Sequence, residues 1–117
     1  MTTNNDLNVG LARLMGREVE IQTATEVRAG GEPRPVWWPV NLPNWAGSLD
    51  ALFAPGGPVE YARSKGIECR VHAQRDGRYR ASATTPRGFL RQPIFATDPA
   101  EALATALHEA FMKEQGQ

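Results

Sequence analysis

The chain has 117 residues, of which 41% are hydrophobic, with 13 basic and 13 acidic side chains and a net charge of zero. This length and composition predict a single globular domain over residues 1–117. Zero net charge excludes bulk electrostatic attraction to nucleic acid or membranes, and the single cysteine, Cys69, excludes an internal disulfide. No apolar run approaches the roughly 20 residues of a membrane span, and the N-terminus lacks a signal-peptide pattern. We therefore expect a cytoplasmic protein.

The first 46 residues predict a helix, a strand and an irregular segment. Asn4 or Asn5 can cap a short amphipathic helix, whose apolar stripe is Leu7, Leu11, Leu14 and Met15. Residues 17–27 alternate apolar or β-branched with polar side chains, which is typical of a strand. Residues 29–46 contain four prolines, two glycines and all three tryptophans. Proline at this density disfavours regular structure, so a loop is predicted there.

The tryptophans of this segment, Trp37, Trp38 and Trp45, admit two interpretations. They could pack a long loop onto the core. Alternatively, Trp37 and Trp38 could form a binding patch, because large aromatic side chains are enriched among the residues that dominate interface energies.

The middle of the chain predicts two short helices and a β-hairpin. Ser48 is a candidate cap for the first helix, and Pro58 suits the first turn of the second. Residues 67–85 alternate apolar and polar side chains on both sides of Asp76-Gly77. A three-residue loop, 75–77, with Gly77 in the left-handed conformation, keeps the apolar side chains on one face. That register pairs Val71 with Ala81.

The C-terminal part predicts a short strand at residues 94–96 and then the clearest helix of the chain. Asp98 and Glu101 have the spacing of a capping box, with Pro99 in the first turn. The buried stripe of this helix is expected to be Leu103, Leu107, Ala110 and Phe111. We expect it to cover the apolar face of the hairpin, burying Val71 and Ala81.

No pattern in the sequence indicates catalysis, a cofactor or a metal site. Cys69 and His72 are three residues apart on one strand, so they should lie on opposite faces, which argues against a nucleophile–base pair. The glycine pairs at residues 30–31 and 56–57 lack a following phosphate-loop lysine. We therefore expect a protein that is not an enzyme and uses no cofactor.

Charge is distributed unevenly along the chain. Residues 63–91 contain eight basic and two acidic residues, a net charge of +6, and the remainder contains five basic and eleven acidic residues, a net charge of −6. The candidate partner-binding residues are Arg70, His72, Arg75, Arg78 and Arg80 around the hairpin, and Trp37 and Trp38 in the proline-rich segment. An arginine-rich surface suits phosphate or carboxylate groups. Because the flanking segments are acidic and would repel nucleic acid, a protein partner is favoured.

Four stretches of the sequence form a recognisable set: the opening helix ending LARLMG, Trp37-Trp38-Pro39, SLDALF, and the final FATDPAEALATALHEAF. In these stretches the chain resembles the small phage-encoded proteins known as phage αβα-sandwich domains. The resemblance implies phage or prophage origin and an accessory role.

We therefore predict an α+β fold: a small antiparallel sheet of three to four strands with a central β-hairpin, packed by two to three helices. The predicted function is a non-enzymatic phage accessory protein that binds a protein partner, most concretely an anti-CRISPR-like inhibitor of a bacterial defence complex in the host cytoplasm. Two alternatives remain: a nucleic-acid-binding module that uses the arginine-rich hairpin face, and a minor structural or assembly factor of the phage particle.

Overall fold

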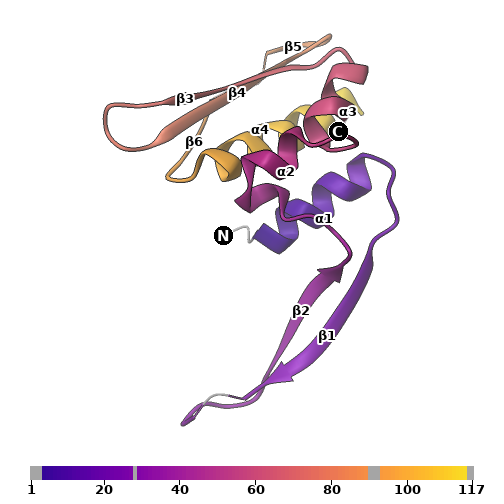
Figure 1. Cartoon of the computed structure of the whole chain (residues 1–117), viewed down its shortest axis with the longest axis vertical. Helices are drawn as coiled ribbons and strands as arrows, with labels where there is room; N and C mark the ends of the chain where they lie inside the picture. The colour runs from indigo at the N-terminus through magenta and orange to yellow at the C-terminus, as the bar shows by residue number, and fades with distance from the viewer. Residues whose placement is uncertain (1–3, 28, 90–92, 116–117) are drawn as a thin grey trace.

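The computed structural model of the chain describes residues 4–27, 29–89 and 93–115. The longest helix, α4 (Pro99–Glu114), lies between a β-sheet and the first helix, α1 (Asn4–Leu14) (Figure 1). Its N-terminus is capped as the sequence predicts: the Asp98 carboxylate accepts hydrogen bonds from the backbone N–H groups of Ala100, at 2.8 Å, and Glu101, at 3.4 Å. The capping residue and Pro99 together define where α4 begins.

The sheet on α4 is antiparallel and is built around its central strand. Its strands are β3 (Glu68–Ala73), β4 (Tyr79–Thr85), β5 (Gly88–Phe89) and β6 (Ile94–Ala96). β3 pairs with one edge of β4, and the two short strands β5 and β6 pair with the other edge. The predicted hairpin register is confirmed, because Val71 pairs with Ala81 and Gly77 has φ of 86°.

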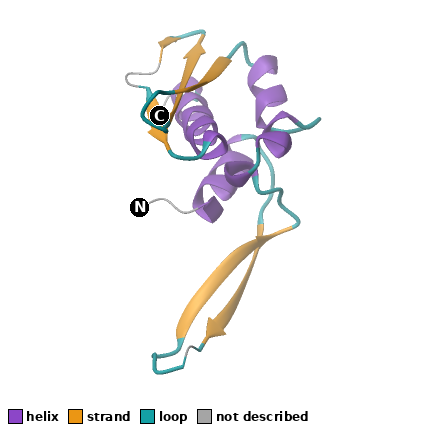
Figure 2. Cartoon of the chain, turned by 60° about the vertical axis from the view of Figure 1, so that its left-hand side comes forward, coloured by secondary structure: helices purple, strands orange, loops and turns teal. Residues whose placement is uncertain are grey.

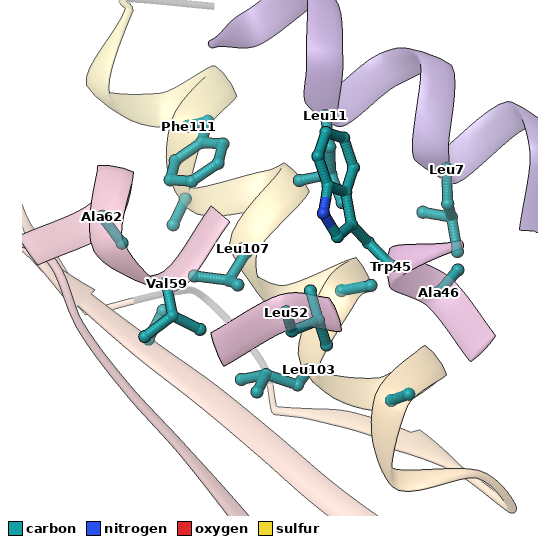
Figure 3. Close-up of a cluster of buried hydrophobic side chains, with 14 of the residues drawn as sticks. Leu7, Leu11, Trp45, Ala46, Leu52, Val59, Ala62, Leu103, Leu107 and Phe111 are labelled. Carbon is teal, nitrogen blue, oxygen red and sulfur yellow. The ribbon is translucent and has the colours of Figure 1, made fainter. Parts of the chain in front are cut away.

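The core is formed where α4 meets three shorter helical segments. These are the 3-10 helix η1 (Trp45–Gly47), α2 (Leu49–Phe53) and α3 (Pro58–Ser64). Trp45 is buried among Leu7, Leu11 and Leu107 (Figure 3). Ser48 caps α2 as predicted, since its hydroxyl accepts a hydrogen bond from the N–H of Ala51.

A two-stranded antiparallel ribbon projects from this body and is named the arm. It consists of β1 (Glu20–Glu26) and β2 (Arg34–Val40), and it extends away from the helices in both views (Figures 1 and 2). Every residue of β1 and β2 is exposed or half-buried. The arm accounts for much of the elongation of the molecule, which measures 49 × 37 × 26 Å.

The predicted α+β class is confirmed, and three finer expectations are corrected. The strands do not form one sheet: β1 and β2 form a sheet of their own. Residues 34–40 form a strand despite Pro35 and Pro39, because an edge strand tolerates proline where its N–H would point away from the partner strand. Val71 is half-buried rather than buried, although Ala81, which pairs with it, is fully buried.

Candidate functional site

The sheet covers α4 with one face and leaves the other face open, and we name the open side the arginine face. Strand alternation directs Val71, Ala81 and Ile94 toward α4. Their neighbours in sequence therefore point to the opposite side. The arginine face consists of Glu68, Arg70, His72, Arg78, Arg80, Ser82, Thr84 and Phe95.

Three of the cations predicted for partner binding lie on or beside this face and have no charged partner in the described part of the chain. Arg70 is opposite Ser82, and His72 is opposite Arg80, in the β3–β4 register. The side chains of Arg70, Arg75 and Arg80 form no ion pair or hydrogen bond with any other described residue, and all three residues are exposed. Their guanidinium groups are therefore available to acidic groups of another molecule.

Arg78 differs from the other arginines because it is held by its neighbours. Its guanidinium contacts the Asp76 carboxylate at 2.7 Å, and Nε donates a hydrogen bond to Asp76 Oδ2 at 2.8 Å. The same guanidinium lies over the ring of Phe95, 4.9 Å from its centroid. The hydrogen bond from the Arg78 side chain is the main reason why the pKa of Asp76 lies below its ordinary value. Arg78 therefore stabilises the turn and partly covers Phe95, and much of its charge is already paired.

Two shallow hollows of about 250 Å³ flank Arg70, one on each side of β3. The first is lined by Glu68, Arg70, Ser82, Ala83 and Thr84. The second is lined by Phe53, Val59, Arg63, Ile67, Glu68, Cys69 and Arg70. Arg70 therefore borders two depressions, and a partner side chain could enter either one beside it.

Cys69 and His72 lie on opposite faces of β3, as the strand alternation predicts. Cys69 packs against the core cluster, whereas His72 is exposed. Burial raises the pKa of the Cys69 thiol above its ordinary value, an effect that the nearby charge of Arg63 partly opposes. A raised pKa keeps the thiol protonated and weakly nucleophilic at neutral pH.

The three tryptophans have different environments. Trp45 is 1% exposed and belongs to the core, where the Arg17 guanidinium lies over its ring at 5.4 Å from the centroid. Trp37 and Trp38 are 37% and 40% exposed on β2. Trp37 pairs with Thr23 and Trp38 with Gln22, so the two rings point to opposite faces of the arm. The arm and the arginine face belong to different sheets, and the predicted binding residues therefore form two separate surfaces.

Phe95 is a functional candidate that our sequence interpretation did not include. It is 44% exposed, pairs with Arg80 and is partly covered by Arg78. The signal was present in the strand alternation, because Ile94 and Ala96 both pack toward α4 and so direct Phe95 outward.

Among residues 4–27, 29–89 and 93–115, no group of three or more histidine, cysteine, aspartate or glutamate side chains is placed to hold a metal ion. None of the described helices is long and apolar enough to cross a membrane. A scan against protein-family models, a search of curated proteins and a search of solved structures each find no match to the chain.

Proposed function

We propose that the chain is a non-catalytic protein that binds an acidic surface of a protein partner through the arginine face. The observation that carries this proposal is the group of exposed cations at Arg70, Arg75 and Arg80, which have no ionic partner among the described residues. Clustered like charges on one small sheet disfavour the folded state through mutual repulsion. A role in packing therefore explains this cluster poorly, whereas a complementary acidic surface would be attracted and oriented by it.

The resemblance to phage αβα-sandwich domains supports a more specific version of this function. A phage accessory protein of this size would act in the host bacterial cytoplasm, and a defence complex is the partner class that we propose. We propose that the arginine face binds an acidic surface of such a complex. Binding there would inhibit defence without any chemical step.

The test compares two double charge reversals with equal net charge. Arg70→Glu with Arg80→Glu changes the arginine face, and Arg13→Glu with Arg87→Glu changes exposed arginines on α1 and in the turn that follows β4. We avoid Arg78 because its pairing with Asp76 holds the turn. A partner recovered from host lysate, then purified, should lose at least tenfold in affinity for the first variant and little for the second. In a host that carries the defence system, only the first variant should fail to restore phage plating.

A result in which both variants bind the purified partner equally would place the interface elsewhere. Circular dichroism and thermal melting of both variants provide the folding control. Equal loss with both variants would indicate a general dependence on net charge and would also contradict the proposal.

A second candidate function, binding of single-stranded nucleic acid, is favoured by Phe95. An exposed aromatic ring beside Arg80 on an open antiparallel sheet can stack a base while arginine contacts the phosphate. Fluorescence anisotropy with single-stranded oligonucleotides over a salt series tests this function. Nucleic-acid binding would weaken steeply with salt and would weaken further in Phe95→Ala, whereas protein binding alone would leave the oligonucleotides free.

A further inference from the structure

The two outer edges of the arm differ in their capacity to bind another strand. Hydrogen-bonded and non-hydrogen-bonded pairs alternate along an antiparallel ladder. Pro35, Trp37 and Pro39 occupy alternate positions of β2, so all three belong to the same kind of pair. Their partners in β1 are Thr25, Thr23 and Ile21. Since proline has no N–H, these pairs belong to the non-hydrogen-bonded set, whose backbone groups point away from the ribbon.

A contact with α1 agrees with this assignment. The side-chain amide of Asn5 donates a hydrogen bond to the carbonyl oxygen of Trp37 at 3.2 Å. This carbonyl therefore faces out of the ribbon, toward α1. The outer edge of β2 has lost two N–H donors to proline and is met by α1 near its middle, so it is protected against pairing with another strand.

The outer edge of β1 has none of these protections. Ile21, Thr23 and Thr25 direct both their N–H and C=O groups outward, and β1 contains no proline. Figures 1 and 2 show no other element beside this edge. An isolated two-stranded ribbon is marginally stable in water, and a further strand or a packed helix stabilises it. The outer edge of β1 is therefore open to a further strand.

The sequence of β1 suits pairing with a second copy of itself. When two copies of β1 pair antiparallel about an axis at Ala24, the small Ala24 side chains meet at the axis. Thr23 is then opposite Thr25 of the other copy, and Gln22 is opposite Glu26. Ile21 is opposite Val27, and these two residues are large apolar side chains that are 40% and 69% exposed in the single chain. All of these pairs are favourable or neutral cross-strand neighbours.

The two registers toward the N-terminal end of β1 are less favourable because of like charges. An axis at Thr23 would place Glu20 directly opposite Glu26, and an axis at Gln22 would place Glu18 opposite Glu26. Like charges directly opposite each other destabilise a sheet. In the register about Ala24, Glu26 keeps its own ion pair with Arg34, at 3.3 Å, and faces a neutral glutamine.

We infer that the arm is a dimerisation element, in which β1 pairs with β1 of a second copy across a two-fold axis at Ala24. The product is a four-stranded antiparallel sheet with β1 strands at its centre and the proline-bearing β2 strands at its edges. The zero net charge of the chain imposes no repulsion between copies. This inference goes beyond the proposed function, because the arginine face belongs to the other sheet and is duplicated on the dimer.

Cysteine cross-linking tests the axis directly. In a Cys69→Ala background, Ala24→Cys places two thiols in a non-hydrogen-bonded pair, with Cα atoms about 4.5 Å apart, within the range that a disulfide spans. Val36→Cys is the matched control: Val36 is opposite Ala24 within the ribbon, but its two copies would lie three strand spacings apart, about 14 Å. Mild oxidation should give a covalent dimer with Ala24→Cys and a monomer with Val36→Cys, measured by mass spectrometry and non-reducing gel electrophoresis.

Sedimentation equilibrium supplies the second measurement on chains without added cysteines. The wild-type chain should be dimeric, Ala24→Lys should be monomeric because two lysines would meet at the axis, and Val36→Lys should stay dimeric. A wild-type monomer with no cross-link at Ala24→Cys would overturn the inference and would leave the β1 edge for a strand of another protein. Cross-linking at Val36→Cys, or at Gln22→Cys in place of Ala24→Cys, would overturn the axis. Neither outcome depends on Arg70 and Arg80, so failure here is distinct from failure of the proposed function.

Discussion

The backbone of Gly10 in α1 lies directly against the imidazole ring of His108 in α4. A Cβ atom added to Gly10 would lie 2.5 Å from Nε2 and 2.8 Å from Cδ2 of His108. Both residues are half-buried. The close approach of α1 and α4 therefore depends on the missing side chain at position 10 and on the position of the imidazole ring.

Gly10→Ala should destabilise the protein, although alanine favours a helix over glycine by about 1 kcal/mol. The added methyl group overlaps His108, and overpacking of this kind typically costs about 1–3 kcal/mol. Urea denaturation of the four members of a double-mutant cycle with His108→Ala checks the prediction. In the His108→Ala background, Gly10→Ala should become neutral or stabilising. The same destabilisation in both backgrounds would show that the imidazole is not the obstacle.

Stability should fall when the pH is lowered through the range in which His108 titrates. Burial lowers the pKa of His108 below its ordinary value of about 6.5, and the charge of Glu109 partly opposes this effect. The unfolded chain therefore binds a proton at a higher pH than the folded chain. The contribution of His108 to the free energy of unfolding is therefore largest above a pH of about 6.5. It decreases as the pH falls below that value, and it becomes constant again once the pH is below the pKa of the folded state.

Urea denaturation at a series of pH values measures this dependence. His108→Gln should flatten the profile between neutral and mildly acidic pH. His72→Gln, at an exposed histidine of β3, serves as the matched control. An unchanged profile in His108→Gln would assign the dependence to other groups.

Phe111→Ala should lower the free energy of unfolding by about 3–5 kcal/mol, the usual cost of truncating a core aromatic residue. Phe111 is 1% exposed, and its ring meets that of Tyr61 edge to face, with centroids 5.1 Å apart. Phe53→Ala is the control, because Phe53 is 55% exposed and should change stability by less than about 0.5 kcal/mol. Chemical denaturation distinguishes the two. A loss below about 1 kcal/mol in Phe111→Ala, far under the core range, would contradict the packing of α4.

Asn8→Ala should cost about 1–3 kcal/mol, because it leaves a buried backbone donor without a partner. Asn8 is buried, and its Oδ1 accepts a hydrogen bond from the N–H of Ala46 at 2.8 Å. Its Nδ2 donates to Oδ1 of Asn44 at 3.0 Å. Asn44→Ala removes only the second bond, at an exposed residue, and should cost less. Equal losses in thermal or urea denaturation would show that the Ala46 bond is not the important one.

The sequence alone determined the features that depend on neighbouring residues. Asp98 and Ser48 cap their helices because a short polar side chain can reach the N–H groups two or three residues later. The hairpin register follows from strand alternation together with Gly77, whose positive φ the three-residue loop requires. The apolar stripe of α4 also follows from its spacing.

The candidate surfaces could be predicted only in part. Arg70, Arg75 and Arg80 are exposed as expected. Strand alternation assigns Arg70 and Arg80 to the polar face of the hairpin, and Arg75 lies in its turn. That Arg78 is held by Asp76 and Phe95 could not be predicted. The reason is that the second contact joins Phe95 of β6 to Arg78, seventeen residues earlier in the chain.

The division into two sheets and the conformation of the proline-rich segment depend on contacts between distant parts of the chain. Pro35 and Pro39 are compatible with a strand because β1 pairs with the edge of β2 that does not require their missing N–H groups. The choice of β1 as partner depends on long-range contacts that the local sequence pattern does not specify. The same choice separates Trp45, which enters the core, from Trp37 and Trp38, which stay on opposite faces of the arm. All three tryptophans come from one proline-rich segment, whose composition predicts only that they are buried or bind a partner. Which of them is buried depends on the surfaces that the fold brings together.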